Sequence, residues 1–213
     1  GLSLESDTLW EMMSDFGFGS YVTDGFPGES RGRLHHHTEW GEIGKATMSY
    51  GYGITVTPIQ LAQAYSVIAN NGLYTPLSLR KGLFNESKRV INEDTAKTLL
   101  SMLEKVVEDG TSKKATVNGY RVGGKSGTAW KTSGAGGYST DRYRSIFAGI
   151  APIDDPRLVA VVFIEEPTGE FYYGGDVAAP VFSEIISQSL QLLSIPPQGF
   201  ITKPDLVADN KND

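Results

Sequence analysis

Apolar residues recur at helical spacing near the start of the chain. Within residues 4–16, Leu9, Met13 and Phe16 are three or four positions apart, and Gly17 follows at a helix-stop position. This pattern predicts a short helix. Residues 18–40 are rich in Gly, Pro and charged residues and predict an irregular loop.

The strongest helix signal begins at Thr57. Thr57 is suited to the N-cap, Pro58 to the first helical position and Gln60 to closing a capping box. Residues 49–53, rich in Gly and Tyr, predict a tightly turned segment that leads into this helix. The residues expected to form its buried stripe are Leu61, Ala64, Tyr65 and Ile68.

Two further helices are predicted downstream. Asn92 is the N-cap of one, which Gly110 ends, and Pro180 starts the other. The apolar face of the first is Ala96, Leu99, Leu100, Leu103, Val106 and Val107. The apolar face of the second is Val181, Phe182, Ile185, Ile186, Leu190 and Leu193.

Between these two helices the pattern becomes extended. Residues 120–131 alternate weakly, and residues 145–152 and 158–165 are apolar strands separated by a turn. Residues 159–164 are apolar at every position, so this strand is expected to be central in the sheet or covered on both faces. The connections between these three segments are too short for a crossover, so neighbouring strands must pair antiparallel. The sequence therefore predicts an α+β fold in which helices flank an antiparallel sheet.

Composition narrows the possible functions. The chain has 213 residues, a formal net charge of -6 and a pI near 5.1, which argue against general binding to nucleic acid or to an anionic membrane. Without cysteine it has neither disulfides nor thiolate zinc ligands. Nothing in the sequence indicates a cofactor.

The run His35-His36-His37 invites a metal hypothesis. Adjacent side chains in a loop seldom converge on one ion, and we expect no carboxylate at helical spacing from them. We therefore predict no metal site here and a packed or solvated loop instead.

The densest candidate chemistry lies in residues 123–131, Gly-Gly-Lys-Ser-Gly-Thr-Ala-Trp-Lys. One ammonium group, two hydroxyls and several glycines there would suit an anion. Two kinds of site fit: a phosphate-binding loop, or a strand that binds a carboxylate beside an acyl-transfer centre. The phosphate loop needs a helix starting at Lys125-Ser126. Gly127 and the glycines of residues 134–137 disfavour such a helix, so nucleotide binding is the remote alternative.

The acyl-transfer hypothesis gives each residue a task. Ser126 and Thr128 are two apart on a strand, project to one side and can both hydrogen-bond a carboxylate. Gly127 lets a substrate backbone lie against the strand, and Lys125 supplies positive charge. The Thr128 amide can be an oxyanion donor.

At this point the chain resembles the transpeptidase domain of class B penicillin-binding proteins, most closely the septal type known as penicillin-binding protein 3. The resemblance covers roughly residues 4–197. It rests on Phe26-Pro27-Gly28-Glu29, Ser49-Tyr50-Gly51-Tyr52-Gly53-Ile54, Val56-Thr57-Pro58-Ile59-Gln60-Leu61-Ala62, Gly124-Lys125-Ser126-Gly127-Thr128-Ala129, Phe147-Ala148-Gly149-Ile150-Ala151-Pro152 and Tyr172-Tyr173-Gly174-Gly175.

The resemblance implies a serine acyl-enzyme reaction on D-Ala-D-Ala stem peptides during cell-wall synthesis at division. Lys125, Ser126, Gly127 and Thr128 would serve the reaction and bind the carboxylate of the stem peptide or of a β-lactam. Tyr172 and Tyr173 would form an aromatic wall. Trp130, a further candidate contact, departs from the family, which often has Arg there.

The resemblance also implies that the family's nucleophilic Ser-x-x-Lys lies upstream of this chain. Ser78 and Lys81 match that pattern, but Pro76 and Gly82 disfavour the required helical turn, so we reject them. We expect residues 1–197 to be the C-terminal portion of a transpeptidase domain and residues 198–213 a flexible polar tail. Alone, the chain is expected to be inactive.

The partners implied are stem peptides, β-lactams, the upstream part of the same domain and other division proteins, without nucleic acid. The implied location is the periplasmic face of the bacterial inner membrane, with an N-terminal anchor outside this chain. The alternative function is a non-catalytic module of the same fold that senses β-lactams or holds division proteins.

Overall fold

The computed structural model describes residues 3–23, 25–83, 85–132 and 137–197. The predicted tail, residues 198–213, lies outside them, as do the glycines of residues 134–136. Within the described residues no helix is both long and apolar enough to cross a membrane.

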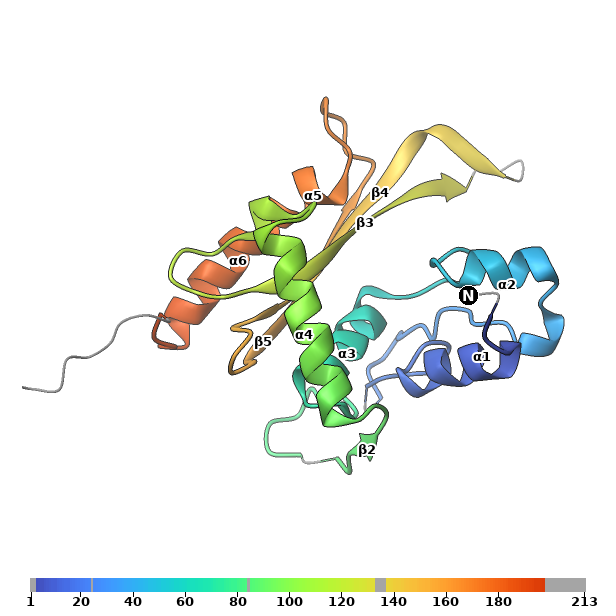
Figure 1. The fold of residues 1–213 in the computed structure, drawn as a ribbon, viewed down its shortest axis with the longest axis horizontal. Helices are drawn as coiled ribbons and strands as arrows, with labels where there is room; N and C mark the ends of the chain where they lie inside the picture. Colours follow the sequence, from blue (N-terminus) through green and yellow to red (C-terminus); the bar gives the residue numbers. More distant parts are fainter. Residues whose placement is uncertain (1–2, 24, 84, 133–136, 198–213) are drawn as a thin grey trace, which may run out of the picture.

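The described chain has helices before and after three consecutive strands that form its main sheet (Figure 1). Strands β3, β4 and β5 are antiparallel, with β4 in the middle. A separate pair of short strands, β1 and β2, lies in the 73–90 connection. The elements are α1 (Ser6–Asp15), η1 (His37–Glu39, a 3-10 turn), α2 (Glu42–Met48), α3 (Pro58–Ala69), β1 (Leu73–Tyr74), β2 (Lys88–Arg89), α4 (Glu93–Glu108), η2 (Lys113–Ala115, a 3-10 turn), β3 (Gly123–Thr132), β4 (Tyr138–Ala151), β5 (Leu158–Glu165), α5 (Gly174–Val177) and α6 (Ala179–Leu192).

The helix starts agree with their sequence signals. The Thr57 hydroxyl accepts a hydrogen bond from the Gln60 amide at 3.2 Å, and the Gln60 side chain accepts one from the Thr57 amide at 3.0 Å. The Asn92 side chain accepts from the Thr95 amide at 2.7 Å. Both predicted caps are confirmed. Helix α2 was not predicted, because it is short, contains Gly44 and has no side-chain cap.

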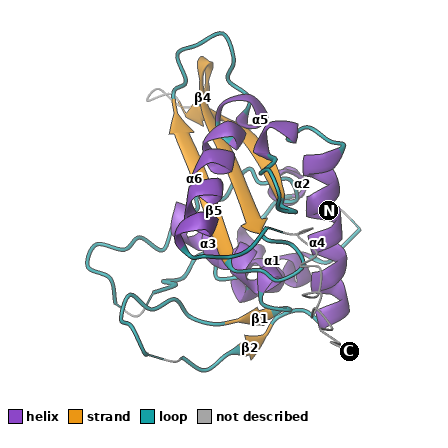
Figure 2. Ribbon diagram, turned by 90° about the vertical axis from the view of Figure 1, so that its left-hand side faces the viewer, coloured by secondary structure: helices purple, strands orange, loops and turns teal. Residues whose placement is uncertain are grey.

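The sheet lies between two helical layers (Figure 2). On one face, α6 packs Phe182, Ile186 and Leu190 against Phe147 and Val162. On the other face, residues of α3 and α4 pack against Ile150 and Val159. The predicted α+β fold with an antiparallel sheet flanked by helices is confirmed.

Gly149 allows α6 to approach the sheet closely. A Cβ atom at this position would lie 2.6 Å from the Phe182 ring, inside van der Waals contact. The Phe147 and Phe182 rings are 4.8 Å apart between centroids, and both side chains are fully buried. This contact fixes α6, and with it the preceding α5, against β4.

An ion pair between exposed Arg121 and buried Glu104 holds α4 beside the start of β3. The Glu104 carboxylate accepts hydrogen bonds from Arg121 Nε at 2.6 Å and from Arg121 Nη2 at 2.7 Å. The Glu104 side chain is 8% exposed, and its hydrogen bonds raise the pKa of Arg121. Glu104 lies within the helix predicted between Asn92 and Gly110. Its burial was not predicted, because it depends on Arg121, 17 positions later.

The prediction for β5 is partly wrong. Helix α6 packs against Ala160, Val162 and Ile164, and α3 packs beside Val159, so helices contact both faces of the strand. Phe163, however, is 42% exposed, so the helices do not cover this strand along its whole length. Among the described strands, β5 is also at an edge of the sheet.

The Phe182→Ala substitution should destabilise the chain by about 3–5 kcal/mol, because it removes a buried ring and leaves a cavity against Gly149. Urea unfolding followed by circular dichroism would measure this loss. Ile185→Ala on the same helix is the matched control: Ile185 is 45% exposed, and its substitution should cost less than about 1 kcal/mol. Equal losses for the two variants would contradict the assigned packing.

Candidate active site

Strand β3 carries the candidate residues along an edge of the described sheet. Ser126 pairs with Phe147, and Thr128 pairs with Ser145. Alternation along the strand puts the Ser126 and Thr128 side chains on one face and Lys125 on the other. The predicted common side of Ser126 and Thr128 is confirmed.

A cavity of about 490 Å³ lies beside these residues. It is formed by the turn after α4, by β3 and by the start of α5. Thus three separate parts of the chain meet at the predicted motif. Its lining residues are Thr111, Lys125, Ser126, Gly127, Thr128, Tyr173, Gly174, Gly175 and Asp176.

Two hydroxyl groups attach the segment before α5 to the sheet. The Thr128 hydroxyl oxygen accepts a hydrogen bond from the Gly174 amide at 3.0 Å. The Ser145 hydroxyl donates to the Tyr172 carbonyl oxygen. Because Thr128 accepts from Gly174, its own hydroxyl proton remains able to donate to a ligand in the cavity.

The start of α5 lies directly on the β3–β4 ladder. A Cβ atom on Gly174 would lie 2.3 Å from the Ile146 carbonyl oxygen and 2.5 Å from that of Gly127. A Cβ atom on Gly175 would lie 2.3 Å from the Thr111 carbonyl oxygen. Only glycine permits this closeness, so backbone packing closes one side of the cavity.

Lys125 brings positive charge to the rim of the cavity. Its ammonium group is on an exposed residue and donates a hydrogen bond to the Ser126 carbonyl oxygen at 2.8 Å. Asp176 adds a negative charge to the opposite wall, where Lys114 contacts it at 2.8 Å.

The predicted aromatic residues form a continuous row. Tyr172 stacks on Tyr143 with a centroid distance of 4.0 Å and an interplanar angle of 14°. Trp130 lies 4.5 Å from Tyr143, and Tyr173 lies 4.4 Å from Tyr172. The structure thus brings Trp130, Tyr172 and Tyr173 together. Tyr143 was missed, although its direct pairing with Trp130 across β3 and β4 explains its place.

An ionic network ties the three strands together beyond the aromatic row. The Lys131 ammonium lies 2.5 Å from carboxylate oxygens of both Glu165 and Glu166, and Arg144 Nε lies 3.0 Å from Glu165. The hydrogen bond from Lys131, followed by that from Arg144, lowers the pKa of Glu165 from its usual value of 4.5.

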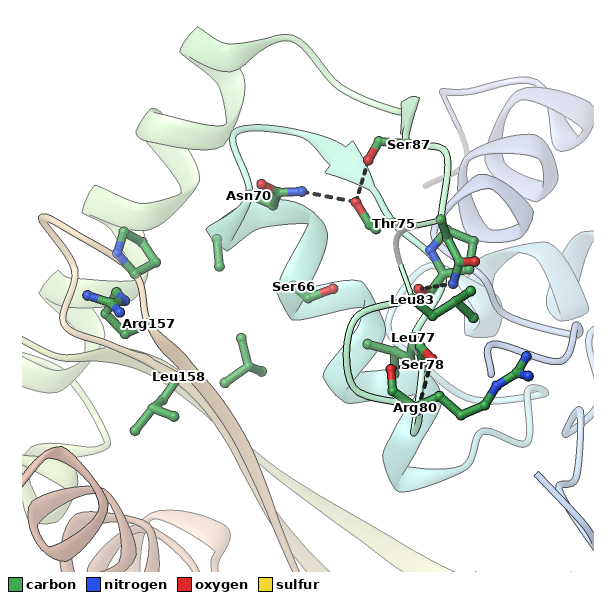
Figure 3. A pocket seen from close by; sticks show the side chains of 15 residues that line it. Ser66, Asn70, Thr75, Leu77, Ser78, Arg80, Leu83, Ser87, Arg157 and Leu158 are labelled. Atoms are coloured by element: carbon green, nitrogen blue, oxygen red, sulfur yellow. Dashed lines mark hydrogen bonds between the residues drawn. The ribbon is translucent and has the colours of Figure 1, made fainter. Parts of the chain in front are cut away.

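Ser78 and Lys81 lie outside this site. The Ser78 hydroxyl donates to the Arg80 carbonyl oxygen at 3.2 Å and accepts from the Arg80 amide at 3.0 Å, within a loop and not a helix. Ser78 lines a different cavity of about 550 Å³, between α3, the 75–87 loop and the start of β5 (Figure 3). The expected absence of a helical turn at this Ser-x-x-Lys pattern is confirmed, and its rejection as the nucleophile stays a prediction.

The histidine run packs as side chains of a loop. His36 and His37 contact each other and Trp10, with ring centroids 4.9 and 5.9 Å from that of Trp10. The expectation that no carboxylate pairs with these residues is wrong: His35 Nδ1 lies 3.0 Å from Glu39, four positions later. In the part of the chain that the structure describes, no three His, Cys, Asp or Glu side chains gather as metal ligands would.

The phosphate-loop alternative is contradicted. Residues 123–132 form one continuous strand, so no helix begins at Lys125-Ser126 to direct its amides at a phosphate. The structure therefore has, in place of a phosphate loop, a cavity along an edge strand of an α+β domain.

Comparison with known proteins then establishes the family. The family described as "Penicillin binding protein transpeptidase domain" matches residues 1–187. The chain belongs to this family, and the resemblance to class B penicillin-binding proteins is confirmed.

Several relatives are similar over most of the chain. PbpC of Pseudomonas aeruginosa, named a probable peptidoglycan D,D-transpeptidase, is 44% identical over 99% of the chain and 37% of its own length. The peptidoglycan D,D-transpeptidase FtsI of Escherichia coli K12 is 38% identical over 94% of the chain and 34% of its own length. The chain thus spans little more than a third of the length of these curated relatives.

A solved structure shows the same fold. The apo transpeptidase domain of penicillin-binding protein 3 from Burkholderia pseudomallei superimposes with a TM-score of 0.84 at 43% identity. The match covers 91% of this chain and 60% of that one.

The Gly174→Ala substitution should disrupt the junction between α5 and the sheet, because the new methyl group collides with two carbonyl oxygens. We expect a stability loss of about 2–4 kcal/mol, within the range of strongly destabilising point mutations, and altered amide signals for Gly127 and Thr128 in NMR spectra. Gly169→Ala is the control, since nothing lies within 4 Å of its would-be Cβ atom. Unchanged Gly127 and Thr128 signals in Gly174→Ala would contradict the close contact between Gly174 and the sheet.

The pKa of Glu165 predicts a pH dependence. Because folding lowers this pKa below 4.5, the charged carboxylate stabilises the fold above that pH, and the contribution disappears as pH falls through the folded value. Glu165→Gln should therefore lose stability at neutral pH and show a weaker acid dependence than the unmodified chain. Urea unfolding between pH 7 and 3 measures both effects. If the free energy of unfolding fell with pH in the same way in the two proteins, ionisation of Glu165 would not contribute to stability.

Proposed function

We propose that this chain forms one wall of the active site of a peptidoglycan D,D-transpeptidase that acts through a serine acyl-enzyme. The observation that carries the proposal is the cavity along β3, which brings the Ser126 and Thr128 side chains together opposite the backbone of residues 173–176. The names of the relatives support the same activity.

The residues of β3 have distinct tasks in this proposal. The Ser126 and Thr128 hydroxyls donate hydrogen bonds to the terminal carboxylate of a D-Ala-D-Ala stem peptide or of a β-lactam, and Lys125 supplies the complementary charge. The would-be Cβ position of Gly127 has only Ile146 nearby, at 3.9 Å, so a substrate backbone has room to lie along the strand. Tyr173 is the aromatic side chain that lines the cavity, and Tyr172 and Trp130 extend the aromatic row away from it.

The reaction itself has two acyl transfers. A serine oxygen attacks the carbonyl carbon between the two D-Ala residues, and the Thr128 amide is an oxyanion donor for the tetrahedral intermediate. Loss of the terminal D-Ala leaves an ester on the serine. An amine of a neighbouring stem peptide then attacks this ester, which forms the cross-link and restores the serine.

The nucleophilic serine comes, in this proposal, from an upstream part of the same domain. Supporting this, the chain covers 37% and 34% of the two relatives above, and Ser78 lies in another cavity, hydrogen-bonded to its own loop. Residues 1–197 would then be the C-terminal portion of the domain, and residues 198–213 a tail beyond it.

The cellular setting is also part of the proposal. Similarity to FtsI supports a role in septal peptidoglycan synthesis, with other division proteins as partners. Stem peptides lie outside the cytoplasm, so the site would work at the periplasmic face of the inner membrane, with the membrane anchor in another part of the protein.

The Ser126→Ala substitution in the full-length protein tests this function. Removing one hydrogen bond to a carboxylate should slow acylation by benzylpenicillin about 10-fold or more. Intact-mass spectrometry at timed intervals measures the rate. Ser78→Ala is the control and should be acylated at the unmodified rate, and the 213-residue chain alone should form no adduct. An adduct on the isolated chain, or an unchanged rate for Ser126→Ala, would overturn the proposal.

A further inference from the structure

Asp176 occupies an unexpected place for an acidic residue. It lines the same cavity as Ser126 and Thr128, where the proposed function requires a substrate carboxylate to bind. A carboxylate in the wall of a site for a carboxylate opposes binding, since like charges repel. Binding of a substrate carboxylate in this cavity is therefore favoured by a positively charged group that pairs directly with Asp176.

Lys114 lies in position to provide that charge. Its ammonium group is 2.8 Å from Asp176 Oδ1 and 5.4 Å from the centroid of the Phe171 ring. The Asp176 side chain is 32% exposed and that of Lys114 is 54% exposed. The pair is thus partly screened by water but close enough for a direct ionic hydrogen bond.

The backbone holds both partners in place. Lys114 belongs to η2, close after Thr111, and the Thr111 carbonyl oxygen abuts Gly175 so tightly that no side chain fits there. Asp176 is fixed from its other side, because its amide donates to the Tyr173 carbonyl oxygen at 2.8 Å. The ion pair therefore spans two segments whose separation is already set by backbone contacts.

We propose that Lys114 is a charge-compensating residue of the carboxylate site: by neutralising Asp176, it lets the cavity beside Ser126 and Thr128 accept a substrate or β-lactam carboxylate. Lys114 acts through Asp176 and does not touch the ligand. This inference rests on the proposed function and adds to it a residue outside the Lys-Ser-Gly-Thr strand.

A purely structural role for Lys114 makes different predictions. If the residue only held the 171–176 segment, removing both charges of the pair would be at least as harmful as removing one. If it neutralises Asp176, removing both charges restores the electrostatic balance. The effect of the single substitution should also shrink at high salt, because the screening length falls from about 10 Å at 0.1 M to about 3 Å at 1 M.

The test measures acylation of the full-length protein by benzylpenicillin, a probe with one carboxylate. Lys114→Gln should lower the second-order rate constant about fivefold in 0.1 M salt, the size expected for one partly exposed ion pair. The loss should fall below about twofold in 1 M salt. The double variant Lys114→Gln/Asp176→Asn should return to within about twofold of the unmodified rate.

Lys113→Gln is the matched control, since it removes the same charge from the same turn. Its rate should equal that of the unmodified protein. Equal rates for Lys114→Gln and Lys113→Gln would overturn the inference while leaving the proposed function intact, and so would a double variant as slow as Lys114→Gln. An unmodified protein that benzylpenicillin does not acylate would instead overturn the proposed function and, with it, this inference.

Discussion

The contact between the start of α5 and the β3–β4 ladder is the constraint on which the site depends. At Gly174 the backbone of one segment lies against carbonyl oxygens of two strands, at a distance that excludes any side chain. The hydroxyls of Thr128 and Ser145 add hydrogen bonds on either side of this contact. The cavity wall is therefore set by backbone packing, which tolerates little displacement, and not by flexible side chains.

This junction in turn relies on packing farther away. Helix α6 continues from α5 and is fixed by the Phe182 ring against Gly149, while α4 is fixed to the start of β3 by Glu104 and Arg121. Each helix thus positions one of the segments that meet at the cavity. Stability of the core and geometry of the site are consequently coupled, because a displaced helix would carry its part of the wall with it.

Sequence reasoning succeeded where the signal was local. The capping box at Thr57, the cap at Asn92 and the hairpin-length turns before β4 and β5 act within a few residues, and together they gave the helices and the antiparallel sheet. It failed where the determinant was distant. The burial of Glu104, the stacking of Tyr143 and the pairing of Asp176 with Lys114 all depend on residues brought together only by the fold. Ser126 and Thr128 were singled out from the concentration of polar groups in residues 123–131, and their common side followed from strand alternation, which is also a local rule.

In the proposed function, the geometry suits Ser126 and Thr128 on β3 to binding a ligand and not to nucleophilic attack. On β3, the Thr128 hydroxyl oxygen already accepts one hydrogen bond from the Gly174 amide, and Ser126 lies in the wall facing the backbone of α5. Two cavity-lining residues could act as a base, but the carboxylate of Asp176 is paired with Lys114, and the Lys125 ammonium group donates to the Ser126 carbonyl oxygen instead of contacting either hydroxyl. Both hydroxyls are suited to donating hydrogen bonds to an anion. In the proposed function, the nucleophile would therefore come from another part of the protein and approach this wall, with the reacting carbonyl of the substrate between the two.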